Sequence, residues 1–349
     1  MKLPPPISPQ PVSPDAGVVE LVERYFSAYN AARLREAAML WAEKIAREDV
    51  VVGLGLSGAL TPAGLGTSCL VPLVRAGLVD FIASTGANLY HDLHYALGMG
   101  LHPFTPHAPD PELKAQGLVR IYDIVMDYRV LLDTDAFVRE ALKDLSGPMP
   151  SPAVHHALGK ALAERGSELA HDSLLVACYE MGVPIYAPSP GDSSIGMNIA
   201  ALALTGQGPA WDVNADVSEA AALLHQARNQ GQKSAVVIIG GGAPKNFLLQ
   251  TGPYLQEVLG LEDHGYDYFI QITDARPDTG GLSGATPSEA VSWGKVDPGA
   301  LPDTVVCYLD ATVALPILTS YLLAKAPKRR PKRLYETRAQ ALEVLKAAL

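Results

Sequence analysis

The stretch Asp49-Val-Val-Val-Gly-Leu-Gly-Leu56 decides the fold, because apolar and β-branched residues run through it without a polar break. A short run of this kind, ended by glycines, is typical of a strand buried on both faces of a sheet. Before it, from Val18 to Arg47, apolar residues recur at helical spacing, which predicts one or two amphipathic helices. A helix after Pro62 and a strand over Val79 to Ala83 would complete a βαβ unit.

The same alternation continues to the end of the chain. Four more strands are predicted, each followed by a turn rich in glycine, proline or aspartate: Val183 to Ala187, Ala235 to Ile239, Tyr268 to Thr273 and Val305 to Leu309. Helical segments lie between strands, at Asp172 to Met181, Val217 to Asn229 and Val313 to Leu323. We therefore expect an α/β fold with a parallel sheet, helices on both faces, and ligands bound beyond the carboxyl ends of the strands.

Residues 17–325 are predicted to form a single α/β domain. The proline-rich residues 1–16 are expected to be a mobile arm, and residues 326–349 a basic tail with a short helix from Leu334. The segment from Leu101 to Pro152 is rich in proline, histidine and charge, and we interpret it as a lid-like excursion within the domain.

Composition narrows the classes of partner. The 349 residues carry a formal net charge of -10, which argues against a nucleic-acid surface and suits cationic ligands, polyamines included. No apolar run approaches the roughly 20 residues of a membrane span. Cys69, Cys178 and Cys307 are far apart and predict free thiols, so we expect a cytoplasmic protein with no membrane partner.

A glycine pattern in the first strand allows two readings. Gly53-x-Gly55-x-x-Gly58 matches the fingerprint of dinucleotide-binding proteins, and Asp80 follows where a ribose-binding acid is expected. Gly53 and Gly55, however, fall inside the predicted strand, and Asp80 precedes its own strand. The alternative is a glycine-rich strand packed against a helix.

Two further motifs could bind a ligand or could have a purely structural role. Gly240-Gly241-Gly242 can serve as a phosphate or polyol cradle before a helix, or simply as a tight turn. His91 and His94, like His155 and His156, could share a metal ion, but no third ligand stands at a characteristic distance. We expect no metal site.

Lys295 is the candidate nucleophile. It follows Trp293 and Gly294, so its amine could be desolvated beside an indole, and a desolvated lysine has a lowered pKa and attacks carbonyl or imine carbons. A surface turn with the lysine in water is the alternative on residue types alone.

Seven segments, in order, resemble the deoxyhypusine synthase family. The most specific is Glu289-Ala-Val-Ser-Trp-Gly-Lys295, which is similar to the active-lysine segment of that family. The others are Ser57-Gly-Ala with Pro62-Ala-Gly, Ser84 to Asp92, Pro184 to Asp192, Ile239 to Gly242 with Lys245, Ser283-Gly-Ala285, and Asp310-Ala311. The resemblance implies a parallel-sheet, Rossmann-like NAD-binding fold and a homotetramer with sites at subunit contacts.

The resemblance also implies a reaction. NAD takes a hydride from the carbon beside the secondary amine of spermidine, Lys295 holds the aminobutyl group as an imine, and an acceptor amine receives it. Glu289 would hold an ammonium end, and Trp293 would lie along the cation with an attraction of about 1 kcal/mol. The remaining substrate-binding positions implied are His91, Asn246, Gly241, Gly280 and Gly281.

For NAD, the resemblance implies contacts at the turns that follow the strands. The residues are Ser57, Gly58, Ala59, Leu60, Thr61, Thr85, Gly86, Ala87, Asp192, Asp274, Ala275, Asp310 and Ala311. This chain departs from the family's pattern in the substrate pocket: Asn246 stands at the catalytic histidine, Tyr90-His91 at an acidic pair, and Met197 and Leu282 at two aspartates. Fewer carboxylates mean a less cation-selective pocket.

Three functions follow from these residues. The first is NAD-dependent aminoalkyl transfer through a Lys295 imine, to a translation-factor lysine or to a small amine such as putrescine or agmatine; the lost carboxylates favour the small amine. The second is a non-catalytic NAD-binding module, and the third is an ordinary NAD-dependent dehydrogenase.

Overall fold

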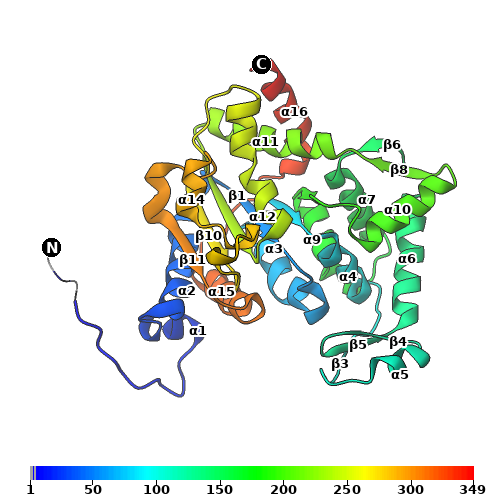
Figure 1. Cartoon of the computed structure of the whole chain (residues 1–349), viewed down its shortest axis with the longest axis horizontal. Helices are drawn as coiled ribbons and strands as arrows, with labels where there is room; N and C mark the ends of the chain where they lie inside the picture. Colours follow the sequence, from blue (N-terminus) through cyan, green and yellow to red (C-terminus); the bar gives the residue numbers. More distant parts are fainter. Residues whose placement is uncertain (1–2, 4) are drawn as a thin grey trace.

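A six-stranded parallel sheet forms the centre of the molecule. The computed structural model describes residue 3 and residues 5–349. The sheet has the order β11-β10-β9-β1-β2-β7, and its strands β1, β10 and β11 are labelled in Figure 1. Its strands are β1 (Val50–Leu56), β2 (Phe81–Ser84), β7 (Ile185–Tyr186), β9 (Lys233–Ile239), β10 (Tyr268–Ile272) and β11 (Thr304–Cys307). The predicted α/β fold with a parallel sheet is confirmed, and each predicted strand overlaps an observed one.

The strand order creates a crevice between β1 and β9. Counted along the chain, the six strands lie in the order 6-5-4-1-2-3, which is that of Rossmann folds. The chain therefore runs outward from β1 in one direction through β2 and β7, then returns to start again at β9. Ligands of such sheets bind where the order reverses, beyond the carboxyl ends of the strands.

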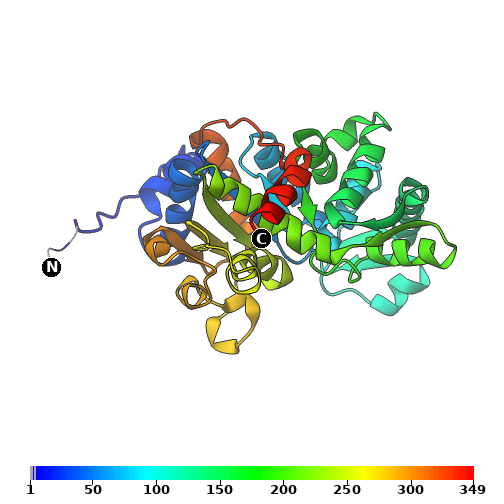
Figure 2. The ribbon, with the colours of Figure 1, turned by 90° about the horizontal axis from the view of Figure 1, so that it is seen from above.

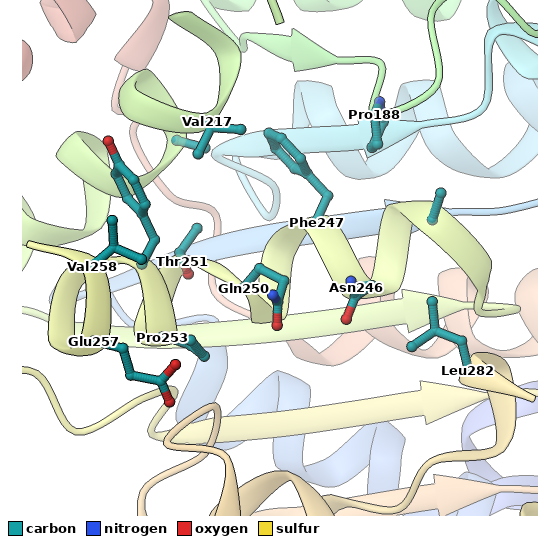
Figure 3. Close-up of a pocket in the computed structure, with 13 residues that line it drawn as sticks. Pro188, Val217, Asn246, Phe247, Gln250, Thr251, Pro253, Glu257, Val258 and Leu282 are labelled. Atoms are coloured by element: carbon teal, nitrogen blue, oxygen red, sulfur yellow. The ribbon is translucent and has the colours of Figure 1, made fainter. Parts of the chain in front are cut away.

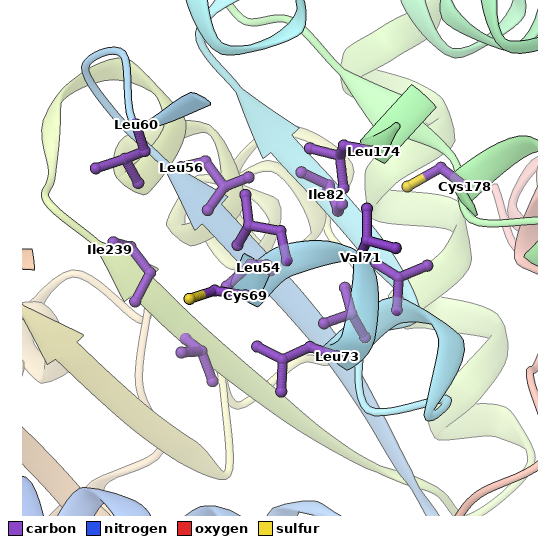
Figure 4. Close-up of a cluster of buried hydrophobic side chains, with 14 of the residues drawn as sticks. Leu54, Leu56, Leu60, Cys69, Val71, Leu73, Ile82, Leu174, Cys178 and Ile239 are labelled. Carbon is purple, nitrogen blue, oxygen red and sulfur yellow. The ribbon is translucent and has the colours of Figure 1, made fainter. Parts of the chain in front are cut away.

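Alternate residues of the central strands face two separate hydrophobic clusters. Val50, Val52, Leu54 and Leu56 of β1 join one cluster, and Val51 joins the other. Figure 4 shows Leu54, Leu56 and Ile82 meeting Val71, Leu73 and Leu174 in the first cluster. Burying each aliphatic side chain contributes about 1.5–3 kcal/mol, so the alternation fixes the strand faces.

Helices cover both faces of the sheet, as predicted (Figures 1 and 2). The first cluster includes residues of α2 (Tyr29–Leu40), η2 (Trp41–Ile45), η4 (Gly66–Leu70), α3 (Val71–Arg75), α4 (Gly86–Ala96), α7 (Ser151–Ala163), α9 (Leu174–Met181), α10 (Ser194–Leu204) and α15 (Ala311–Lys325). The second includes residues of α11 (Val213–Asn229), α12 (Gly242–Leu249), η5 (Tyr254–Val258), α14 (Pro287–Ser292) and α16 (Leu334–Ala347). Shorter helical turns are α1 (Val18–Glu20), η1 (Leu21–Tyr25), η3 (Thr61–Ala63), α8 (Glu168–His171), α13 (Thr251–Pro253), η6 (Pro277–Thr279), η7 (Leu282–Gly284) and η8 (Pro298–Asp303).

The segment interpreted as an excursion contains regular structure of its own. A small antiparallel sheet joins β3 (His102–Pro103), β5 (Ile124–Asp127) and β4 (Leu118–Ile121), with α5 (Asp110–Ala115) beside β4. The helix α6 (Tyr128–Leu142) follows, and β6 (Ser146–Met149) pairs with β8 (Gly208–Trp211). In Figure 1 these elements lie on the side of the molecule opposite α14.

The chain after residue 325 packs on the body of the molecule. Arg329 is 6% exposed, and its Nη2 lies 2.7 Å from Oδ2 of Asp80. The helix α16 contributes Ala341 and Leu345 to the same cluster as α11. The predicted helix from Leu334 is thus present. At the other end, residues 5–12 are exposed and outside regular structure, and residues 1, 2 and 4 of the predicted arm lie outside the described residues.

The dinucleotide fingerprint is wrong as a local motif. Gly53 and Gly55 lie inside β1, where a Cβ on Gly53 would come 2.6 Å from the Phe81 ring and one on Gly55 would come 3.3 Å from Leu248 of α12. These glycines therefore allow close packing, which agrees with the alternative of a glycine-rich strand packed against a helix. Asp80 lies just before β2, at the amino end of the sheet, accepts a bond from the Val52 amide at 2.8 Å and pairs with Arg329, so it cannot bind a ribose at the carboxyl edge.

Across the described part of the chain, no helix is both long enough and apolar enough to cross a membrane. The three cysteines are buried and free, as predicted.

Candidate active site

The turns after β1 and β9 meet at the crevice. Ser57 Oγ accepts a hydrogen bond of 3.1 Å from the amide of Gly241, and the Gly242 amide donates to Ser283 Oγ at 2.8 Å. A Cβ on Gly241 would lie 2.4 Å from that of Ser283, so only glycine allows this approach. The triple glycine is therefore a tight turn that joins the loops after β1, β9 and β10.

A helix cap presents Lys295. The helix α14 ends at Ser292, and Gly294 adopts a left-handed φ of 64°. The Gly294 amide donates to Val291 O at 3.0 Å, and the Lys295 amide donates to Ala290 O at 3.0 Å. These two bonds form a Schellman motif, which explains the Trp-Gly-Lys sequence locally. The cap turns the chain so that Lys295 points back toward α12.

The Lys295 amine is partly buried against an amide and an indole. Its Nζ lies 3.2 Å from Oδ1 of Asn246 and 5.6 Å from the centre of the Trp293 ring. Burial lowers the pKa of this amine, while the negative charges of Glu289 and Glu257 act in the opposite direction. Among the described residues no carboxylate lies within ion-pairing distance of it. The alternative of a lysine extending freely into water is therefore wrong.

Two adjoining cavities flank Asn246. A cavity of about 330 Å³ contains Lys295, Lys245, Glu289, Trp293 and Leu249 among its lining residues. A larger one of about 530 Å³ is lined by apolar groups that include Pro188, Val217, Phe247, Tyr254 and Val258. Five residues line both cavities: Asn246, Gln250, Pro253, Glu257 and Leu282. Figure 3 shows the amide groups of Asn246 and Gln250 on the same side of α12.

Lys245 fixes the wall of the smaller cavity. It is 1% exposed, and its Nζ donates to Gln271 Oε1 at 2.9 Å, Ser283 O at 3.2 Å and Ala285 O at 2.6 Å. Gln271 in turn donates to Gly240 O and Ser283 O, both at 2.8 Å. Burial lowers the pKa of Lys245 to about 8. This network ties the loop after β10 to α12.

Some predicted substrate-binding residues lie outside these cavities. His91, on α4, bonds to His94 at 3.0 Å, and burial lowers its pKa. Gly280 and Gly281 are exposed in the loop between η6 and η7. The structure thus brings Lys295, Trp293, Glu289 and Asn246 together, with Gly241 at the start of α12, and leaves His91, Gly280 and Gly281 apart from them.

The predicted cofactor residues lie along the carboxyl edge of the sheet. Gly58 and Ala59 follow β1, while Gly86 and Ala87 open α4, which Thr85 caps. Asp274 and Ala275 follow β10, and Asp192 is exposed after β7. Asp310 caps α15 by accepting a hydrogen bond of 2.7 Å from the Thr312 amide, and Ala311 is the first residue of that helix. Leu60 and Thr61 are buried instead, and the Thr61 hydroxyl donates to Asn88 O at 2.7 Å.

The turn after β1 and the start of α4 present groups that suit a nucleotide phosphate. Gly58 has a φ of 67°, and no atom lies within 4 Å of the position that its Cβ would occupy. Among the described residues, the amides of Gly86 and Ala87 at the start of α4 make no backbone hydrogen bond, and helix starts of this kind favour phosphate. The donors present therefore suit the phosphates of a dinucleotide, although Ser193 closes the side of Gly86 on which a Cβ would lie, at 2.3 Å.

Sequence reasoning missed two lining residues and the role of a third. Gln250 and Glu257 line both cavities, and Lys245 organises the wall of the smaller one. Gln250 stands four residues after Asn246 on α12, a spacing that places both on one helical face and could have revealed it. Glu257 lies on η5 in a segment without a motif. No group of three or more residues suited to hold a metal ion occurs in the described part of the chain.

The fold and this site define a class: a Rossmann-like α/β protein with a partly buried lysine beside the ligand-binding edge of its sheet. The chain matches the deoxyhypusine synthase family over residues 20–322. It is 58% identical to a "Deoxyhypusine synthase-like protein" of Cyanothece sp. (strain PCC 7425 / ATCC 29141), over 97% of this chain and 87% of that protein. It is 36% identical to "Probable deoxyhypusine synthase 2" of Methanosarcina acetivorans, over 86% of this chain and 84% of that one.

The chain therefore belongs to the deoxyhypusine synthase family, and membership implies a transferase. The fold agrees with a crystal structure assigned to deoxyhypusine synthase from Entamoeba histolytica, with a TM-score of 0.57 over 91% of this chain and 97% of that one. At 15% identity this last likeness speaks for the fold alone.

Proposed function

We propose that this protein transfers an aminobutyl group from spermidine or a related polyamine, through a covalent imine on Lys295, to a small acceptor amine. The observation that carries the proposal is the Lys295 amine, held 3.2 Å from Asn246 Oδ1 inside a cavity, with its pKa lowered by burial. A lysine with a lowered pKa has a larger neutral, nucleophilic fraction at a given pH than an ordinary lysine.

NAD, bound along the turns after the strands, would accept the hydride from the polyamine and return it to the product. Gly58, Gly86 and Ala87 would face its phosphates, and Asp192, Asp274 and Asp310 would offer acceptors for its hydroxyl or amide groups. Buried Leu60 and Thr61 would support this wall from behind.

The residues of the chain then carry the transfer. The Lys295 amine adds to the imine carbon of the oxidised polyamine and expels 1,3-diaminopropane, leaving the aminobutyl carbon double-bonded to Nζ. The acceptor amine adds to the same carbon, and Lys295 leaves as the free amine. The hydride that NAD would supply is what the product imine needs to become a secondary amine.

Polar groups of the cavity suit cationic intermediates. The negative charges of Glu289 and Glu257 stabilise positive charge near Nζ, and the Trp293 ring lies 5.6 Å from Nζ. The Asn246 amide does not titrate, so it can position the amine but cannot transfer a proton. Proton transfer is left to water or a carboxylate. A small acceptor fits a cavity whose carboxylates are few.

A homotetramer with sites at subunit contacts is part of the proposal. Apolar side chains beside the two cavities are exposed in the single chain, among them Trp293 at 56%, Leu282 at 44% and Val258 at 69%. Such groups favour cover by another surface. Size-exclusion chromatography with light scattering tests this, and a monomer at all concentrations would contradict it.

Product analysis by mass spectrometry tests the reaction. The full-length protein is incubated with NAD, spermidine and one of putrescine, agmatine or a translation-factor protein. We expect a new secondary amine with the small acceptors, equimolar 1,3-diaminopropane and no net NADH. Net NADH build-up without transfer would identify a dehydrogenase instead.

A further inference from the structure

The larger cavity is lined by one carboxylate, which forms no bond to any residue that the structure describes. Glu257 is exposed on η5, and among the described residues it has neither a hydrogen bond nor an ion pair. The remaining lining groups are apolar or uncharged, including Asn246, Gln250 and Thr251. A carboxylate at the edge of an apolar cavity is complementary to a cation on an alkyl chain.

Glu257 also borders the cavity that holds the nucleophile. It lines both cavities with Asn246 and Gln250, and its negative charge acts on the Lys295 amine. Figure 3 shows Glu257 on the helical turn next to α12, with Val217 and Phe247 on the other side of the cavity. A molecule with one end at Lys295 and an alkyl chain along α12 would therefore pass Glu257.

We infer that the larger cavity is the subsite for the acceptor, and that Glu257 selects an acceptor with a second cation. The ligand class is an α,ω-diamine or a guanidinoalkylamine. Its near amine adds to the imine carbon at Lys295, while its methylene chain lies against Val217, Phe247 and Tyr254. The role of the bound amine as acceptor rests on the proposed function, whereas binding of the amine in the larger cavity does not.

The experiment compares putrescine with butylamine, which has the same chain and no second cation. Glu257→Gln keeps the shape and removes the charge, and Glu262→Gln, at an exposed position outside both cavities, is the matched control. With NAD and spermidine, we expect Glu257→Gln still to form the Lys295 adduct, with a lower pH midpoint because the charge that raises the Lys295 pKa is gone. Its KM for putrescine should rise about tenfold or more, as expected for loss of a charge-assisted hydrogen bond, and its KM for butylamine should not change.

A second variant probes the cavity itself. Val217→Trp fills the larger cavity from a position that does not line the smaller one, so it should slow transfer to putrescine more than adduct formation. For Glu257→Gln, an unchanged KM for putrescine, or equal rises in KM for putrescine and butylamine, would overturn the assignment. For Val217→Trp, a loss of adduct formation equal to the loss of transfer would overturn it.

Calorimetry separates this inference from the proposed function. If the wild type forms no adduct, the proposed function fails, and binding of putrescine still decides the subsite. Tighter binding of putrescine than of butylamine, lost in Glu257→Gln and kept in Glu262→Gln, supports the subsite. Equal binding of the two amines by the wild type overturns it.

Discussion

The Lys295 amine lies 3.2 Å from Oδ1 of Asn246, on a helix that starts at the carboxyl end of the neighbouring strand β9. This pair connects the two halves of the site. The α14 cap presents the amine, and α12 supplies an uncharged acceptor for it. An amide oxygen can orient an amine without fixing its proton, as a carboxylate would.

Replacing Asn246 by aspartate should move the pH dependence of the nucleophile upward. Burial lowers the pKa of Lys295, so adduct formation should rise with pH through that lowered value. A carboxylate at hydrogen-bonding distance stabilises the ammonium form, and we expect Asn246→Asp to shift the midpoint up by about one pH unit or more. Adduct formation with spermidine, measured across pH, checks this. Asn246→Ala adds no charge and should not raise the midpoint; a shared upward shift would contradict the account.

Lys245→Met should destabilise the protein. The change removes the donor to Gln271 Oε1, Ser283 O and Ala285 O, and acceptors left unpaired in the interior cost about 1–3 kcal/mol. Urea denaturation measures the free energy of unfolding. Lys328→Met, at an exposed position without a bond among the described residues, should stay within about 0.5 kcal/mol of the wild type. Equal values for the two variants would show that the network is unimportant.

The same lysine gives a pH effect on stability. Its pKa of about 8 in the folded protein is below the 10.5 of an ordinary lysine, so the unfolded chain binds more protons between these two values. Stability contributed by this group therefore rises as the pH goes from about 8 toward 10.5. The free-energy difference between wild type and Lys245→Met should grow from pH 7.5 to pH 9.5. A constant difference would mean that the lysine keeps an ordinary pKa.

Gly58→Ala should weaken NAD binding. Gly58 and Gly117 have similar left-handed φ values, 67° and 73°, with no atom near the position of a Cβ. Alanine at either position should cost about 1–2 kcal/mol of stability. Gly58 borders the crevice, whereas Gly117 lies between α5 and β4, so calorimetric titration should show weaker NAD binding in Gly58→Ala alone. Equal affinities in the two variants would place the cofactor elsewhere.

Arg329→Met should destabilise the protein more than any surface change. It leaves the Asp80 carboxylate buried without its cation, which costs about 3–5 kcal/mol. Arg330→Met, one residue away and exposed, is the control for urea denaturation. A small effect of Arg329→Met would mean that the chain after residue 325 contributes little to the fold.

Local patterns were sufficient for the strands, whereas Lys295 was singled out by the family resemblance. The apolar run of β1 and the turns after the strands predict a parallel sheet with its ligand edge, because both signals are local in sequence. The family resemblance then identified Lys295 with Trp293 and Glu289, and the structure brings these three together with Asn246.

Pairing across long distances could not be read from the sequence. Asp80 follows Gly58 at a plausible spacing, yet it pairs with Arg329, 249 residues away, at the opposite end of the sheet. Gly53 matches a phosphate-binding motif, but its freedom from a side chain makes room for Phe81. Glu257 carries no motif and joins the site only because η5 packs beside α12.

Covalent trapping on Lys295 tests the central claim most directly. The protein is incubated with NAD and spermidine, reduced with borohydride, digested and examined by peptide mass spectrometry. The account predicts an aminobutyl adduct on Lys295 that requires NAD and is absent from Lys295→Arg. No adduct with spermidine, putrescine or agmatine, or an adduct on Lys245 instead, would contradict it.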